Sequence, residues 1–306
     1  MDSKILAILI VGILLMGCTT TQNQTNSSKL QVVTSFRPFT LLVAPVAGSD
    51  AQITQILPPG ADPHDYEPTP KDAMTLQNAS LFFYDGPFME PWASSLAAAA
   101  NQNIKLVSFA DSVPPQAFAQ MQQEYKNFPN ASQDPHMWLS PKLAEYFVPY
   151  VAQQLSEADP AHAADYDANA QAFEARLQKL DADYTAGLAN CSTRTFLTSH
   201  AFLDYVAADY NLTAISIAGL SPDAEPSIQQ MDSVISESKA DNVMGVLSEP
   251  DETQTLSQSV ASELKLPLYP FSTMEILPGG VQNASLDYIN IEEQNLQELR
   301  LALGCR

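Results

Sequence analysis

Basic residues are scarce in this chain. Its 306 residues include 14 lysines and arginines against 35 aspartates and glutamates, which gives a formal net charge of -21. A protein that binds nucleic acid or anionic lipid by electrostatic attraction needs a positive surface. The charge balance therefore argues against nucleic acid as a partner and against electrostatic binding to an anionic membrane.

The chain also lacks a long hydrophobic run. Residues 5–16 are apolar or glycine throughout, but as a helix they would extend only about 18 Å, short of a ~30 Å hydrocarbon core. The run follows Lys4 and is typical of a signal peptide, which we expect over residues 1–17. It ends in Leu15-Met16-Gly17-Cys18, which resembles the lipobox of exported lipoproteins, although an ordinary signal peptide with a chance cysteine is the alternative.

A lipid on Cys18 would anchor the protein to a membrane. Residues 18–29 are polar and lack an apolar anchor, which is typical of a flexible tether. We therefore expect a protein at the cell surface or on the periplasmic side of the cytoplasmic membrane, held there by its lipid after export.

Cysteine is rarer still, with three residues and no Cys-x-x-Cys pair. A thiolate zinc site is accordingly not expected. If Cys18 carries lipid, Cys191 and Cys305 are left, and in an oxidising compartment such a pair commonly forms a disulfide. We expect this disulfide, with two free thiols as the alternative, because the distance between cysteines cannot be read from a sequence.

Strand and helix patterns alternate on both sides of a long helical segment. From Asp159-Pro160 to Asn190, apolar residues recur at helical spacing, which predicts one rigid helix of about thirty residues. Strand–helix alternation is typical of α/β proteins with mostly parallel sheets flanked by helices. We expect two such lobes with separate cores, over residues 30–158 and 191–306, joined by the helix over residues 159–190. The expected strands cover residues 30–35, 52–57, 81–84, 195–198, 213–217, 243–247 and 267–271.

Three of only four histidines stand in loop-forming contexts beside apolar stretches. They are His64, His136 and His200. Neutral imidazoles from three distant points in a chain are typical ligands of a borderline-soft divalent cation, with zinc the leading candidate. In open α/β sheets, ligands bind beyond the carboxyl ends of the strands, so we expect the metal in the cleft between the lobes. The fourth, His162, has no second ligand at helical spacing and is expected at the surface.

The motifs around these histidines resemble one known family, the metal-specific substrate-binding lipoproteins of ABC importers, and in particular its zinc-binding branch. The resemblance implies two α/β lobes joined by one long helix. It also implies a monomeric binding protein rather than an enzyme, which captures Zn2+ as its transported ligand and delivers it to an ABC permease in the membrane. The motifs are Pro63-His64-Asp65-Tyr66-Glu67-Pro68-Thr69-Pro70, Tyr84-Asp85-Gly86 with Glu90-Pro91-Trp92, Asp134-Pro135-His136-Met137-Trp138-Leu139-Ser140-Pro141, Ser199-His200-Ala201-Phe202 with Tyr205, Ser221-Pro222-Asp223-Ala224-Glu225-Pro226-Ser227, and Asn295-Leu296 with Leu299.

The same resemblance implies that His64, His136 and His200 are the metal ligands. Manganese-binding relatives generally carry a glutamate where this chain has His200. Oxygen ligands suit manganese, and a third imidazole favours zinc. A manganese- or iron-binding member of the family is the alternative.

The fourth ligand departs from the family pattern. Members often carry an aspartate after the last strand of the second lobe, whereas this chain has Ser272. Glu275 is the preferred substitute, and a water, Asp65 or Glu67 are the alternatives. Carboxylates commonly orient metal-bound imidazoles, and the candidates for that role are Asp134, Glu225 and Glu249.

Two other functions fit parts of this pattern. Three histidines with a water are also the ligands of hydrolytic zinc enzymes, in which the open position activates the water. A carboxylate that closes this position would suppress such chemistry. An adhesin that retains the fold is the other alternative.

Overall fold

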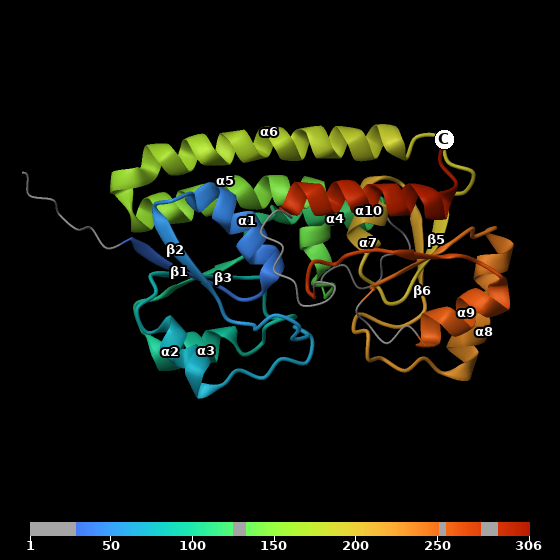
Figure 1. Cartoon of the computed structure of the whole chain (residues 1–306), viewed down its shortest axis with the longest axis horizontal. Helices are drawn as coiled ribbons and strands as arrows, with labels where there is room; N and C mark the ends of the chain where they lie inside the picture. The colour runs from blue at the N-terminus through green and yellow to red at the C-terminus, as the bar shows by residue number, and fades with distance from the viewer. Residues whose placement is uncertain (1–28, 125–132, 251–254, 277–286) are drawn as a thin grey trace, which may run out of the picture.

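The computed structural model describes residues 29–124, 133–250, 255–276 and 287–306 (Figure 1). The expected signal peptide over residues 1–17, Cys18 and all but the last residue of the expected tether lie outside these ranges. Within them, none of the helices combines the length and the apolar character needed to cross a membrane.

The first sheet contains four parallel strands in the order β2-β1-β3-β4. Strand β3, one of its two central strands, has the sequence Leu-Phe-Phe-Tyr and is buried along most of its length, as expected for a parallel strand covered on both faces. The strands are β1 (Leu30–Thr34), β2 (Ala51–Gln55), β3 (Leu81–Tyr84) and β4 (Lys105–Ser108), and the helices around them are α1 (Arg37–Ala47), α2 (Pro70–Leu76), α3 (Ala93–Ala100), η1 (Ala110–Ser112) and α4 (Pro115–Glu124).

The second sheet repeats this topology. Its four parallel strands have the order β6-β5-β7-β8. In both sheets the second strand lies on one side of the first strand, and the third and fourth strands lie on the other side. The point where the strand order reverses is called a topological switch point, and it leaves a crevice at the carboxyl ends of the strands. The elements are β5 (Thr195–Thr198), α7 (Asp204–Asp209), β6 (Thr213–Ser216), α8 (Ile228–Ala240), β7 (Val246–Ser248), α9 (Thr255–Leu264) and β8 (Leu268–Pro270).

Three long helices lie along one side of both sheets: α5 (Pro141–Ala158), α6 (Ala163–Gly187) and α10 (Tyr288–Leu303). Figure 1 shows α6 running above α5 and α10 along most of the molecule. It packs against α1, α5 and α10, so it joins the two halves of the chain. This confirms the predicted α/β architecture with one long connecting helix.

The connecting helix is shorter than predicted at both ends. It begins at Ala163 instead of Asp159, after a separate turn η3 (Pro160–His162). The Asp159 carboxylate accepts a hydrogen bond from the Tyr166 hydroxyl, 3.1 Å away, and lies 2.6 Å from Nδ1 of His162. These contacts fold Asp159 back over the first turn, outside the helix.

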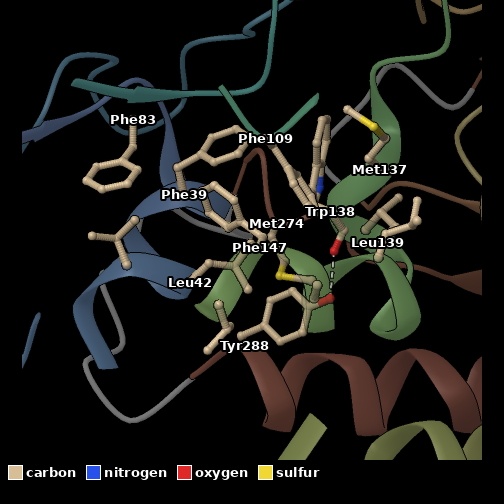
Figure 2. Packing of buried hydrophobic residues seen from close by; sticks show 14 of the residues in the cluster. Phe39, Leu42, Phe83, Phe109, Met137, Trp138, Leu139, Phe147, Met274 and Tyr288 are labelled. Atoms are coloured by element: carbon tan, nitrogen blue, oxygen red, sulfur yellow. Dashed lines mark hydrogen bonds between the residues drawn. The ribbon is translucent and has the colours of Figure 1, made fainter. Parts of the chain in front are cut away.

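The prediction of two separate cores is wrong. One continuous cluster of buried apolar residues extends from the first sheet through the long helices to part of the second sheet, and a smaller cluster lies between the second sheet, α8 and α9. Trp138 lies within the large cluster beside Phe39 (Figure 2). Its ring Nε1 donates to the carbonyl of Thr273 at 2.8 Å, and its own carbonyl accepts from the Tyr288 hydroxyl at 2.6 Å. The segment before α5 is therefore bonded directly to residues near the end of the chain.

The predicted disulfide between Cys191 and Cys305 is present and closes a loop with a sequence separation of 114. It joins the segment after α6 to the end of α10, where Gly304 adopts the left-handed conformation (φ 60°) that ends the helix.

Candidate metal centre

The three predicted histidines come together where the carboxyl ends of the two sheets face each other. His64 lies in the loop after β2, His136 begins the short helix η2 (His136–Leu139), and His200 lies just after β5. Their ring centroids are 5.3 Å (His64 to His136), 5.8 Å (His64 to His200) and 5.2 Å (His136 to His200) apart. One nitrogen from each ring can be chosen so that all three lie within 4.8 Å of one another.

Two of these histidines are held by the same tripeptide, Asp-Pro-His. Asp62 Oδ1 accepts the main-chain N–H of His64 at 2.8 Å, and Asp134 Oδ1 accepts that of His136 at 2.9 Å. An aspartate that bonds the main chain two residues ahead forms a tight turn, and the intervening proline fixes one of the backbone angles. The Asp-Pro-His sequence thus fixes the backbone conformation at each of these two histidines.

Carboxylates lie behind two of the rings. Asp134 Oδ1 is 2.7 Å from Nδ1 of His136, and Glu249 Oε1 is 3.2 Å from Nδ1 of His200. The other oxygen of Glu249 accepts a hydrogen bond from the Thr273 hydroxyl at 2.5 Å. A carboxylate at Nδ1 favours the tautomer that leaves the Nε2 lone pair available for a cation.

The third carboxylate predicted for this role lies elsewhere. Glu225 is exposed on the segment before α8, and among the described residues no hydrogen bond connects it to a histidine. His162 is half-exposed and pairs with Asp159, away from the three clustered rings.

Glu275 is the carboxylate that faces the histidines. Its Oε2 lies 3.7 Å from Nε2 of His64 and its Oε1 lies 3.8 Å from Nε2 of His136. These distances are too long for hydrogen bonds, but they are close to the roughly 3.3 Å that separates two ligand atoms of a tetrahedral zinc ion. Met274 precedes it with a left-handed backbone (φ 65°), a strained conformation that turns the chain sharply just before Glu275.

The other candidates for a fourth position differ in their surroundings. Asp62 forms a second possible cluster with His64 and Glu275. Asp65 and Glu67 are exposed and belong to neither cluster. Asp62 was missed by sequence reasoning, although the recurrence of Asp-Pro-His at residues 62–64 and 134–136 was a signal that could have identified it.

Burial keeps the imidazoles in their neutral, metal-binding form. It lowers the pKa of His136 to about 3, and burial together with the neighbouring His136 lowers that of His64 to about 4. The pKa of His200 is well below its ordinary value for the same reasons. The Nε2 atoms of His64 and His136 are buried without a hydrogen-bond partner among the described residues. Buried nitrogens with free lone pairs, beside a carboxylate, form a site that a divalent cation would satisfy.

Comparison with known proteins gives the chain its family. It is 31% identical to the high-affinity zinc uptake system protein ZnuA of Bacillus subtilis, over 94% of this chain and 92% of that protein. It is also 31% identical to the zinc-binding protein AdcA of Streptococcus pyogenes, over 89% of this chain, but it spans only 56% of that longer protein.

Two solved structures have the same fold over 90% of this chain and 99% of theirs. The laminin-binding protein Lmb of Streptococcus agalactiae, described as a bifunctional protein with adhesin and metal transporting activity, is 26% identical with a TM-score of 0.78. The Zn(II)-bound ZnuA-like domain of Streptococcus pneumoniae AdcA is 29% identical with a TM-score of 0.74. The sequence pattern of the periplasmic zinc-uptake complex component A matches residues 32–302, and the chain therefore belongs to this family, ZnuA.

Proposed function

We propose that this protein captures zinc outside the cytoplasmic membrane and delivers it to an ABC permease. The observation that carries the proposal is the convergence of three buried imidazoles and the Glu275 carboxylate on one small volume. Zinc capture is also what the names of the relatives state for those proteins.

The proposed ligands are His64, His136, His200 and Glu275. Three neutral nitrogens and one carboxylate oxygen suit zinc, whereas manganese is favoured by sites richer in oxygen. The four side chains are largely buried and already lie side by side.

The proposed role of Glu275 also separates this function from that of a three-histidine zinc hydrolase. A hydrolase keeps one coordination position open for a water that it activates. In our proposal the Glu275 carboxylate closes that position, so the ion is held without a reactive water.

Calorimetric titration of chelator-treated protein with zinc, and competition with manganese, test the ligand set. We expect His200→Ala to weaken zinc binding strongly, because alanine offers no ligand atom. Glu275→Gln should weaken it less, because the amide keeps an oxygen and loses only the charge. The matched control is His162→Ala, since His162 is half-exposed and pairs with Asp159. Equal effects of His200→Ala and His162→Ala, or tighter binding of manganese than of zinc, would contradict the proposal.

Anchoring and delivery are tested in cells. We propose that a lipid on Cys18 holds the monomer at the membrane, so Cys18→Ser should release it to the soluble fraction without changing zinc affinity. Deletion of the gene should stop growth in chelated medium, and added zinc should restore it. Growth that is indifferent to zinc would contradict a role in uptake.

Adhesion is a second candidate function, favoured by one comparison. Lmb of Streptococcus agalactiae, which shares the fold, is described as both adhesin and metal transporter. Binding of the purified protein to immobilised laminin, compared with binding to albumin, tests whether this chain shares that property. Equal binding to both surfaces would rule it out.

A further inference from the structure

A cavity adjoins the metal centre, and Asp134, which contacts His136, also lines this cavity. It has a volume of about 620 Å³ and lies between the ends of β3 and β4, η1, α4, α7 and the turn before His136. This volume falls in the range of pockets that hold small organic molecules, and it is far larger than the roughly 30 Å³ of a water.

Two buried carboxylates line this cavity. Asp85 is 2% exposed and Asp134 is 3% exposed. Asp85 Oδ1 and Asp134 Oδ2 are buried and have no hydrogen-bond partner among the described residues. Burial and the neighbouring Glu90 raise the pKa of Asp85 well above its ordinary range. Carboxyl oxygens left without partners are costly, and no lysine, arginine or histidine is present among the described residues that line the cavity.

Asp85 holds the position in the first sheet that Glu249 holds in the second. It directly follows β3, just as Glu249 directly follows β7, and the two strands hold the same place in the order of their sheets. Glu249 lies against His200, whereas Asp85 lines the cavity. The crevice beyond the switch point of the first sheet thus has its own carboxylate.

Four aromatic side chains contribute to the wall, beside small, apolar and polar residues that include the exposed Asp111. Phe118 and Tyr205 pack edge to face with ring centroids 6.4 Å apart, and Tyr84 and Phe88 are the other two aromatic residues of the lining. Phe88 is 60% exposed, so an occupant could cover it. Aromatic faces attract cations and also pack against carbon skeletons. A lone inorganic ion would leave this wall and most of the volume unused.

We propose that this cavity binds a small organic cation, with its ammonium group between Asp85 and Asp134 and its carbon skeleton against Phe88 and Phe118. An ammonium group that replaces the proton of Asp85 would satisfy carboxyl oxygens that otherwise have no partner among the described residues, so this end of the cavity selects for a cation. The aromatic wall selects for an organic one. The site is distinct from the three histidines, although Asp134 borders both.

The probe is 2-phenylethylammonium, titrated calorimetrically into zinc-loaded protein at neutral pH. Its matched analogues are 2-phenylethanol, which is neutral, and 3-phenylpropionate, which is an anion. We expect the ammonium compound to bind and the other two not to bind detectably. Equal binding of the alcohol and the ammonium compound would overturn the proposal, as would the absence of binding.

Variants locate the probe. Asp85→Asn keeps the shape of the side chain but cannot ionise when a cation enters, and should weaken binding about tenfold or more, as expected for a charged hydrogen bond. The control is Asp183→Asn on α6, which removes an exposed charge that pairs with Lys179. Phe118→Leu removes part of the aromatic wall and gives an independent reading if Asp85→Asn folds poorly.

Metal analysis of each variant verifies that the neighbouring site is intact. Binding that is unchanged in both Asp85→Asn and Phe118→Leu would place the probe elsewhere and refute the assignment. Displacement of the probe by a second equivalent of zinc would assign the cavity to an inorganic cation and would also refute it.

Discussion

Replacement of Glu292 by glutamine should remove one large contribution to the dependence of this protein's stability on pH. Glu292 lies on α10 and is fully buried. The Tyr184 hydroxyl donates to its Oε2 at 2.6 Å. Burial raises the pKa of Glu292 to about 8 from an ordinary value of 4.5, although hydrogen bonds from Tyr184 and Asn295 oppose this rise.

The sign of the effect follows from where the proton is held. Between about pH 4.5 and pH 8 the unfolded chain has released the Glu292 proton, whereas the folded protein retains it. The free energy of unfolding therefore falls as the pH rises through this window. One pKa unit corresponds to about 1.4 kcal/mol, so the loss across the whole window is on the order of 5 kcal/mol.

Urea unfolding of zinc-free protein between pH 5 and pH 8.5 measures this loss. Glu292→Gln should resemble the wild type near pH 5 and should be several kcal/mol more stable relative to it near pH 8. The matched control is Glu293→Gln, which removes an exposed charge from the next position of the same helix. Other buried acids contribute equally to all three proteins and cancel in the differences. Parallel pH profiles of Glu292→Gln and the wild type would show that Glu292 titrates as an ordinary glutamate.

The other predictions concern the metal centre and the disulfide. Asp134→Asn removes the charge behind His136 and should weaken zinc binding about 10- to 100-fold in competition titrations; unchanged affinity would show that this carboxylate does not act on the ligand. Zinc affinity should stay nearly constant from pH 8 down to about pH 5, because burial lowers the pKa of His64 to about 4 and of His136 to about 3, and protons compete with the metal only near and below such values. A decline that begins near pH 6.5 would mean that the imidazoles titrate as exposed histidines do. Replacement of both Cys191 and Cys305 by serine should lower the free energy of unfolding by about 4–5 kcal/mol in the chain-entropy model, measured by urea titration. Alkylation of unreduced native protein should modify neither cysteine, and a modified pair would contradict the bond.

Strong local patterns made most of the fold predictable. The strands β1 and β3 are short segments rich in β-branched or aromatic residues, and the structure places them within a residue or so of the expected positions. β4 (Lys105–Ser108) was not predicted, because four residues with an exposed lysine give little signal. The helix α5 was missed as well. It contains Pro149, which ordinarily ends or kinks a helix, but its packing against α6 and α1 outweighs that local cost.

The candidate site was predictable to the extent that its residues are rare or stand in recognisable motifs. Histidine is scarce, so three histidines in loops were conspicuous. Glu275 and Glu225 were both plausible from sequence, but only the folded chain places the first beside the imidazoles and the second in solvent. Buried acids such as Asp85 and Glu292 could not be predicted, because a carboxylate is normally found at the surface and its burial depends on contacts between distant segments.

The bond between Cys191 and Cys305 encloses all four strands of the second sheet within one covalent loop. His200 and Glu275 lie inside this loop, whereas His64 and His136 lie outside it. A protease that cuts any single peptide bond within the loop therefore leaves two fragments that remain attached through sulfur. On a denaturing gel without reductant the nicked protein should run as one species, and only a reductant should separate the fragment that carries His64 and His136 from the one that ends at Arg306.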